Sequence, residues 1–344
     1  MLLPDSGSST RLALYQERLS DNIVRCLLCP HCCVLEEGIV GICHARMNRR
    51  GDLCTLGYGN PCSLAVDPIE KKPLFHFLPG RKILSLAVAG CNFRCLNCQN
   101  WEISQSFPND FKKYDLTPEE VISLAEENYI DCIAFTYTEP IVFYEYVFDI
   151  AKAAHGRGVK TVLVTNGYIN EKPLLELCPY INAVNVDLKC IKDDVYRRLT
   201  AGSLQPVINT LKTLKSQGVW LEITNLLIPG ISDRSDMIHE MCDWLVKNGF
   251  EDTPLHFSRF FPAYQLNHLK PTPEEVLLQA KKIAEAAGIK YVYIGNNPDL
   301  NGENTFCPNC KRMVVERCGY VVRQNMVQDG QCDFCGERIP GVWS

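Results

Sequence analysis

Residues 83–98 read ILSLAVAGCNFRCLNC. The first seven form a short apolar run that ends at Gly90, which is typical of a buried strand. Cys91, Cys95 and Cys98 follow in the spacing C-x3-C-x2-C. Thiolates select zinc or iron–sulfur clusters, and three in one loop can hold three irons of a [4Fe–4S] cluster while the fourth iron stays open. A zinc site completed by a distant ligand is the alternative.

Strand and helix patterns alternate from this loop to about residue 295. Further apolar runs predict strands at 132–136, 160–165, 183–187, 219–227, 255–257 and 291–294. One helix is expected to begin at Thr117, where a capping threonine is followed by proline and two acidic residues. A second is expected over about 141–154, and two more from caps near Ser232 and Thr272. Such alternation predicts an α/β fold with a parallel sheet covered by helices. The number of repeats favours a partial (β/α)6 TIM-like barrel.

Two more cysteine groups flank this core and predict three units: an N-terminal Cys-rich extension (1–80), the barrel (81–295) and a C-terminal tail (296–344). In the extension, Cys26, Cys29, Cys33 and Cys43 give C-x2-C-x3-C-x9-C, although Cys32 or His31 could take the place of Cys33. We expect a metal there. Zinc is favoured because no sequence feature supplies a redox path, and an auxiliary iron–sulfur cluster is the alternative.

The tail carries a second four-cysteine pattern. Cys307, Cys310, Cys332 and Cys335 give C-x2-C-x21-C-x2-C, two knuckles that can close a tetrahedral site of the zinc-ribbon or rubredoxin type. Zinc is the first choice and iron the second, with short strands expected at 313–317 and 320–322. Cys318 is not expected to be a metal ligand. The scattered thiols are expected to be small buried hydrophobes: Cys132, Cys178, Cys190 and Cys242.

Composition limits the remaining choices. The chain has 344 residues, of which 46% are hydrophobic, and its formal net charge of -5 offers no basic field for nucleic acid or membrane lipid. We expect no secretory signal at the N-terminus, and there is no apolar run of about 18 residues. Because 19 cysteines are present without a signal peptide, we expect a reducing, cytoplasmic location and metal-binding thiols instead of disulfides.

Polar residues follow several of the expected strands. They are Thr138, Glu139, Asn166, Asp187, Lys189, Asn225 and His256. Because active sites of parallel α/β folds lie at the carboxyl ends of strands, these positions predict one site. Each also has a purely structural interpretation: Glu139 as a helix cap, Asp187 and Lys189 as an ion pair, and His256 as a satisfied core histidine.

The cysteine loop and these strand ends resemble the radical S-adenosylmethionine (SAM) superfamily over about residues 81–294. The resemblance implies that Cys91, Cys95 and Cys98 hold a [4Fe–4S] cluster whose open iron binds SAM. Reductive cleavage of SAM then gives a 5′-deoxyadenosyl radical, which abstracts a hydrogen atom from the substrate. The seven polar residues would contact SAM. Related activating enzymes have Gly-Gly before the glutamate, where this chain has Tyr137 and Thr138. They have Asp where Val164 stands, which argues against their monovalent-cation site here.

The whole chain resembles the radical SAM enzyme of the AmmeMemoRadiSam system. The stretches that carry this resemblance include CLLCP (26–30), DPIEKKPLFHFLPG (67–80), CQNWE (98–102) and HFSRF (256–260). That family accompanies Memo-like and AMMECR1-like proteins and is related to the pyruvate formate-lyase activating enzymes. The resemblance implies an electron donor such as flavodoxin or ferredoxin, and a protein or peptide substrate.

Two other functions stay open: a radical SAM enzyme that modifies a small molecule, and a metal-bound scaffold without chemistry. A protein substrate needs a wide rim, so an N-terminal unit that seals the rim would argue against it. Residues 67–80, which mix lysine, histidine and aromatic side chains, are expected either to line the mouth of the site or to clasp the barrel bottom.

Overall fold

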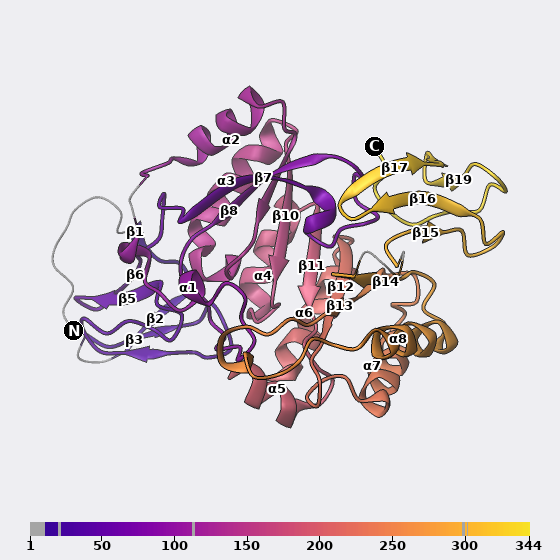
Figure 1. Cartoon of the computed structure of the whole chain (residues 1–344). Coiled ribbons are helices and arrows are strands. Elements are labelled where there is room, and N and C mark those ends of the chain that lie inside the picture. Colours follow the sequence, from indigo (N-terminus) through magenta and orange to yellow (C-terminus); the bar gives the residue numbers. More distant parts are fainter. Residues whose placement is uncertain (1–10, 20–21, 112–113, 298–299, 301) are drawn as a thin grey trace.

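The structure is a computed structural model that describes residues 11–19, 22–111, 114–297, 300 and 302–344. At its centre is an eight-stranded sheet in the order β14-β13-β12-β11-β10-β9-β8-β7 (Figure 1). The strands are β7 (Ser63–Pro68), β8 (Lys82–Ala87), β9 (Cys132–Phe135), β10 (Lys160–Thr165), β11 (Ala183–Asp187), β12 (Trp220–Leu227), β13 (Leu255–Arg259) and β14 (Val292–Gly295).

The sheet confirms the predicted parallel arrangement. Strands β8 to β14 pair in parallel and in sequence order, whereas β7 pairs antiparallel with β8. Sequence order is what a β/α barrel requires. The edge strands are β7 and β14, and no ladder joins them within the described residues. Strand β7 therefore adds an antiparallel edge that the periodicity did not predict.

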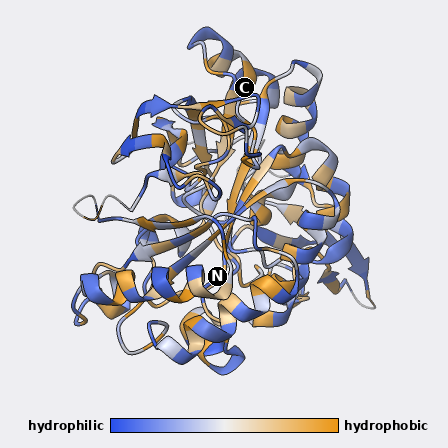
Figure 2. Ribbon diagram, turned by 90° about the vertical axis from the view of Figure 1, so that its right-hand side faces the viewer, coloured by the Kyte–Doolittle hydropathy of each residue, from blue (hydrophilic) through white to orange (hydrophobic). Residues whose placement is uncertain are grey.

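Helices separate the strands, as the sequence predicts. The α-helices are α1 (Trp101–Ser104), α2 (Pro118–Glu127), α3 (Tyr144–Gly156), α4 (Glu171–Leu177), α5 (Asp193–Thr200), α6 (Leu204–Ser216), α7 (Ser235–Lys247) and α8 (Glu274–Ala287). The short 3-10 helices are η1 (Ile69–Lys71), η2 (Pro108–Asp110), η3 (Pro140–Phe143), η4 (Cys178–Tyr180) and η5 (Tyr264–Leu266). Figure 2 shows mostly apolar strands surrounded by helices that have both apolar and polar faces.

The start of α2 shows why one of these helices begins where it does. The Thr117 hydroxyl accepts a hydrogen bond from the Glu120 amide at 3.2 Å, and the Glu120 carboxylate accepts one from the Thr117 amide at 2.7 Å. This reciprocal pair satisfies two amides that have no partner within the helix. The capped helix predicted from Thr117 is thus confirmed.

The N-terminal residues form two small antiparallel sheets, β1-β6-β5 and β2-β3-β4. Their strands are β1 (Arg11–Leu12), β2 (Gln16–Arg18), β3 (Val24–Cys26), β4 (Val34–Leu35), β5 (Arg46–Arg49) and β6 (Asp52–Thr55). Figure 1 places them to the left of the central sheet. Their buried side chains, among them Val24, Leu28 and Ala45, join the same hydrophobic core as the sheet.

The C-terminal residues form β15 (Thr305–Phe306), β16 (Met313–Cys318), β17 (Val321–Asn325), β18 (Val327–Gln328) and β19 (Gln331–Cys332). This confirms the two short strands predicted between the knuckles. The tail is fastened to residues 67–80: the His76 ring lies 2.7 Å from the Pro340 carbonyl oxygen, and the Val342 amide donates to the His76 carbonyl at 2.8 Å. The C-terminal tail is therefore packed against the body of the molecule through residues 67–80.

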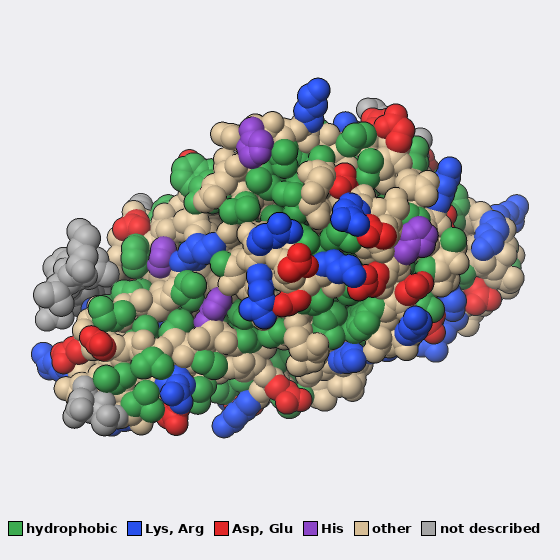
Figure 3. Space-filling model, turned by 90° about the horizontal axis from the view of Figure 1, so that it is seen from below, with side chains coloured by type: hydrophobic (Ala, Val, Ile, Leu, Met, Phe, Trp, Pro, Cys, Tyr) green, Lys and Arg blue, Asp and Glu red, His purple; other side chains and the backbone are tan. Residues whose placement is uncertain are grey.

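Two surface properties bear on function. No helix among the described residues is long and apolar enough to cross a membrane. The face seen from below in Figure 3 carries acidic and basic side chains side by side, with no region of one sign. All the cysteines are free, and the four scattered thiols expected in the core, Cys132 among them, are buried.

Candidate active site and cysteine centres

A cavity of about 510 Å³ lies at the carboxyl ends of the parallel strands. Its lining includes Cys91, Cys95 and Cys98, and also Thr138, Glu139, Asn166, Asp187, Lys189 and His256. Nine of the ten residues predicted for this site thus meet in one space. Asn225 does not line the cavity. Its side-chain amide donates to the Leu188 carbonyl at 2.7 Å, and its Oδ1 is buried without a partner.

The cysteine loop is held by its surroundings. The Phe93 amide donates to Cys91 Sγ at 3.4 Å, and Asn166 Nδ2 lies 4.0 Å from the same sulfur. Burial raises the pKa of Cys95 to about 12 and that of Cys91 well above its usual value. Since only thiolates bind metals, iron binding must displace these protons.

Glu139 connects the ends of two strands. Its carboxylate accepts hydrogen bonds from the Thr165 hydroxyl at 2.6 Å, the Asn166 amide at 2.8 Å and the Ile141 amide at 3.2 Å. Burial raises the pKa of Glu139 to about 7, although these hydrogen bonds oppose the rise. The residue therefore caps η3, as its structural interpretation requires, and also lines the cavity.

Asp187 and Lys189 form an ion pair at the end of β11, with 2.7 Å between Oδ2 and Nζ. Burial favours the neutral amine of Lys189, but the Asp187 carboxylate and the nearby Cys95 outweigh it and raise the pKa. Lys189 is therefore a cation beside the cysteine loop. The pair has the geometry of an ordinary ion pair and also lines the cavity.

His256 is tied to a residue that the sequence interpretation missed. Its Nε2 lies 2.6 Å from the Glu222 carboxylate, which also accepts the backbone amides of Phe75 and His76 at 3.0 and 2.8 Å. Glu222 is fully buried in the middle of β12. The available signal was a single acid within the otherwise uncharged run WLEITNLL, because a carboxylate is rarely buried without partners.

Part of residues 67–80 lines the cavity, namely Glu70, Lys71, Lys72, Pro73 and Phe75. Leu74, Phe77 and Leu78 instead share a buried cluster with Cys132 and Ala183, where β9 and β11 begin, so each of the two expectations holds for part of the stretch. Lys72 is 1% exposed, and its amine donates to Asp67 at 2.7 Å. Burial lowers the pKa of Lys72 to about 8 despite this partner. Tyr137 donates its hydroxyl to Asp67, and its ring centre lies 4.4 Å from the Lys72 amine. No pattern in the sequence indicates that these three residues form one network.

Tyr137 also explains a departure from related sequences. Its φ of 66° lies in the left-handed region, which glycine adopts without strain and other residues rarely occupy. The resemblance to the activating enzymes implies glycine at this position. Here, the contacts of Tyr137 with Asp67 and Lys72 stabilise the strained backbone at the cavity wall.

The C-terminal tail borders the same mouth, since Glu303 and Tyr320 are among the lining residues. Arg317 fixes it: its guanidinium donates to the Phe75 carbonyl at 2.6 Å and to the Thr305 hydroxyl at 2.9 Å. The same guanidinium lies 3.7 Å from the Glu70 carboxylate, and both side chains are fully buried.

The two C-terminal knuckles close on each other, as their spacing predicts. The Sγ atoms of Cys307, Cys310, Cys332 and Cys335 all lie within 4.8 Å of one another. The sulfur atoms of Cys307 and Cys335 are 3.6 Å apart, and those of Cys310 and Cys332 are 3.8 Å apart. Four thiols around one point suit a single tetrahedral metal ion. Cys318 is exposed and stands outside this group.

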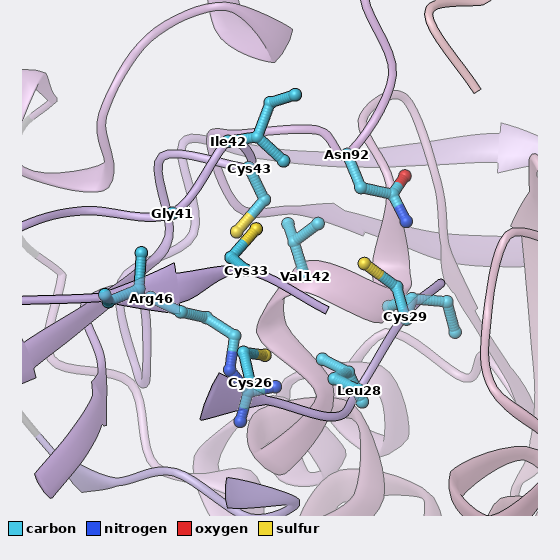
Figure 4. A pocket seen from close by; sticks show the side chains of 12 residues that line it. Cys26, Leu28, Cys29, Cys33, Gly41, Ile42, Cys43, Arg46, Asn92 and Val142 are labelled. Atoms are coloured by element: carbon cyan, nitrogen blue, oxygen red, sulfur yellow. The ribbon is translucent and has the colours of Figure 1, made fainter. Parts of the chain in front are cut away.

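The four N-terminal cysteines line a separate small pocket with Arg46 and Asn92, and neither His31 nor Cys32 is part of its lining (Figure 4). His31 instead lies with its Nε2 2.8 Å from the Asn92 carbonyl oxygen. The pocket is therefore made from the first of the alternative cysteine sets that the sequence offered.

The large cavity suits the cluster and cofactor that the resemblance implies. Its three thiols are free, and no three metal-binding atoms of this loop lie within 4.8 Å of one another in the described part of the chain. These thiols are thus not gathered around one point as the C-terminal thiols are. The buried Oδ1 of Asn97, in the same loop, lacks a partner. The cofactor roles of the individual residues stay predictions.

Comparison with known proteins points the same way. The family model of the Radical SAM superfamily matches residues 86–245. An uncharacterized protein of Methanocaldococcus jannaschii is 45% identical over 337 residues, which cover 96% of this chain and 98% of that protein. The pyruvate formate-lyase 1-activating enzyme of Escherichia coli is 25% identical over 231 residues, which cover 62% of this chain and 93% of that enzyme.

Among solved structures, a domain of the pyruvate-formate lyase-activating enzyme from Bacteroides vulgatus is similar with a TM-score of 0.41 and 17% sequence identity. The similarity covers 47% of this chain and 98% of that domain.

Proposed function

We propose that this chain, whose residues 86–245 match the radical SAM superfamily, is an enzyme that abstracts a hydrogen atom from a protein or peptide. The observation that carries the proposal is that three free thiols, the Asp187–Lys189 pair and Glu139 line one cavity. When bound, a [4Fe–4S] cluster on Cys91, Cys95 and Cys98 and SAM together supply the 5′-deoxyadenosyl radical.

The cavity residues bind and orient the cofactor in this proposal. The Lys189 amine attracts the SAM carboxylate, while Asp187 keeps that amine charged and offers an acceptor to ribose hydroxyls. Both carboxylate oxygens of Glu139 are already engaged by the chain. Glu139 therefore acts by fixing the ends of β9 and β10, so that nearby carbonyl oxygens are left for the SAM amino group.

Access to the cavity supports a protein or peptide substrate over a small molecule. Of the N-terminal unit (1–80), only residues from Glu70 onward line the cavity, so the two small sheets between Arg11 and Thr55 do not close the mouth. The mouth is bordered by Lys71, Tyr137 and Tyr320. An opening bordered by aromatic and basic side chains suits an inserted peptide loop. A small-molecule substrate is the second candidate, because 510 Å³ is also within the usual range of small-ligand sites.

The remaining components follow from the same proposal. A flavodoxin or ferredoxin would supply electrons, and a zinc ion would occupy the C-terminal four-thiol site, with iron as the alternative. The oxygen-sensitive thiols suit a reducing compartment such as the cytoplasm. The finer resemblance to the AmmeMemoRadiSam enzyme stays a prediction, and Memo-like and AMMECR1-like proteins are the first protein substrates to test.

The test of the reaction uses protein that is purified without oxygen and reconstituted with iron and sulfide. After reduction and addition of SAM, we expect 5′-deoxyadenosine from the wild type and none from a Cys95→Ala variant. If a fully loaded wild type releases no nucleoside and SAM leaves its paramagnetic resonance spectrum unchanged, the scaffold function is favoured instead.

A second measurement separates the two substrate classes. Anaerobic cell extract is divided by ultrafiltration, and each fraction is added to the reduced enzyme with SAM. The protein-substrate proposal expects the retained fraction to raise 5′-deoxyadenosine formation and protease treatment to abolish the effect. Stimulation by the filtrate alone would contradict it and favour a small molecule.

A further inference from the structure

The cysteine groups of this chain have two different spacings. The four C-terminal Sγ atoms all lie within 4.8 Å of one another, as ligands of one ion do. Within the described residues, no three Sγ atoms of Cys26, Cys29, Cys33 and Cys43 lie that close together. The same is true of the Cys91 loop, whose family binds a cluster of four irons. Like the Cys91 loop, the N-terminal group is thus not gathered around one point as the single-ion site is.

The N-terminal thiols also surround an open space. Figure 4 shows the four cysteine side chains around one pocket, with Arg46 beside Cys26 and Val142 behind them. The pocket measures about 20 Å³, which is more than the roughly 10–15 Å³ that one water molecule requires.

The charge at the pocket favours an anionic centre. Arg46 is 1% exposed, and its Nη2 donates to Glu145 at 2.6 Å and to the Leu14 carbonyl at 2.8 Å. Its Nε and Nη1 are buried without any partner. Unpaired donors of a buried cation are costly, and they suit the sulfur atoms of a centre with four thiolate ligands, which carries negative charge.

The pocket shares a wall with the Cys91 loop. The Asn92 side chain lines the N-terminal pocket, whereas the neighbouring Cys91 lines the large cavity. Arg94 of the same loop donates to the Cys91 carbonyl at 2.8 Å and to the Ile42 carbonyl, next to Cys43. A redox centre in the pocket would therefore adjoin the cluster loop directly. No redox path between these two sites was apparent from the sequence.

We propose that Cys26, Cys29, Cys33 and Cys43 bind a [4Fe–4S] cluster, in addition to the cluster of the Cys91 loop. Four thiols that line one pocket without being gathered around a single point, and the unpaired donors of Arg46, support it. It departs from the preference for zinc drawn from the sequence. The proposal goes beyond the reaction proposed above and does not depend on it, because the site can be examined without the Cys91 cluster.

The test uses the full chain with Cys91, Cys95 and Cys98 all replaced by serine, reconstituted without oxygen with iron and sulfide. We expect about four acid-labile sulfides per chain, half the wild-type amount, and a paramagnetic signal after reduction. Sulfide is the decisive readout because a zinc ion or a single iron in the C-terminal site carries none. Adding Cys29→Ser and Cys33→Ser should remove the sulfide, whereas adding Cys54→Ser, outside the pocket, should not.

Circular dichroism of each variant ensures that a folded protein is compared. A folded triple variant that binds no sulfide overturns the proposal, as does one that binds two zinc ions per chain and no sulfide. Wild type that carries both clusters but forms no 5′-deoxyadenosine would contradict the proposed reaction and leave this site unaffected.

Discussion

Replacing Gly90 by alanine tests how tightly the N-terminal unit packs on the cysteine loop. Gly90 precedes Cys91 and has a φ of 109°, which residues with a side chain rarely adopt. A Cβ at this position would lie 2.5 Å from the Cys43 carbonyl oxygen and 3.4 Å from the Ala45 Cβ. The obstacle is backbone of the N-terminal unit, so it cannot rotate away as a side chain can.

The expected cost follows from these two effects. An unfavourable φ costs about 1–3 kcal/mol, and forcing extra volume into a packed contact costs about 1–3 kcal/mol more. We therefore expect Gly90→Ala to lower the free energy of unfolding by about 4 kcal/mol. Gly158 is a matched control, because its φ of 73° is also positive but a Cβ there meets nothing within 4 Å. Gly158→Ala should cost only about 1–2 kcal/mol.

Urea unfolding of the two variants, prepared in parallel without oxygen, measures the difference. Iron analysis of the folded Gly90→Ala protein shows in addition whether the Cys91 loop still binds its cluster, and we expect a reduced content. If Gly90→Ala destabilises the protein no more than Gly158→Ala does, then the close contact between Gly90 and Cys43 does not exist as described.

Three further perturbations test other parts of the structure. The pKa of Glu139 rises from 4.5 to about 7 on folding, so the folded protein keeps a proton that the unfolded chain has released. The free energy of unfolding of the wild type should therefore fall by up to about 3 kcal/mol as pH rises from 5 to 8. Urea unfolding of Glu139→Gln should not show this decline. Equal pH profiles for the two proteins would refute the effect of burial on Glu139. Cys310→Ser removes a ligand and should weaken metal binding at the C-terminal site more than about 100-fold. Metal analysis against a chelator series measures this, and Cys318→Ser should match wild type. Arg317→Met leaves Glu70 buried without a cation and should lower the free energy of unfolding by about 3–5 kcal/mol in thermal or urea unfolding. As the control, Arg323→Met at an exposed position should lower it by less than about 0.5 kcal/mol. Equal losses in the two variants would count against the buried pair.

Much of the fold was predictable because its signals are local. The seven parallel strands are short apolar runs bounded by turn residues, and the helix from Thr117 has a cap that its own sequence specifies. Strand β7 escaped prediction, since SLAVDP looks like any short irregular segment until it pairs with β8. The tail's attachment to His76 was equally hidden, because it depends on residues 264 positions apart.

The candidate site was predictable where the spacing of the cysteines indicates metal binding, as in the cysteine loop and the C-terminal knuckles. Residues that act through tertiary contacts were missed. Lys72 reaches the cavity only because η1 places its amine beside Asp67. Glu222 lies inside a strand, and its partners come from two distant segments. Asn225 stands at a strand end as expected, yet its amide turns to the Leu188 carbonyl and away from the cavity.

The fastening of residues 67–80 by the C-terminal tail has a consequence for protein synthesis. The wall of the cavity contains Phe75, whose carbonyl is bound by Arg317, a residue 242 positions later in the chain. A ribosome finishes all eight strands of the central sheet before it has made this guanidinium. Until then, the nascent chain lacks the contact that fastens this part of the cavity wall. This part of the wall can be completed only after residues 317 to 342 have been made, so the tail completes the cavity last.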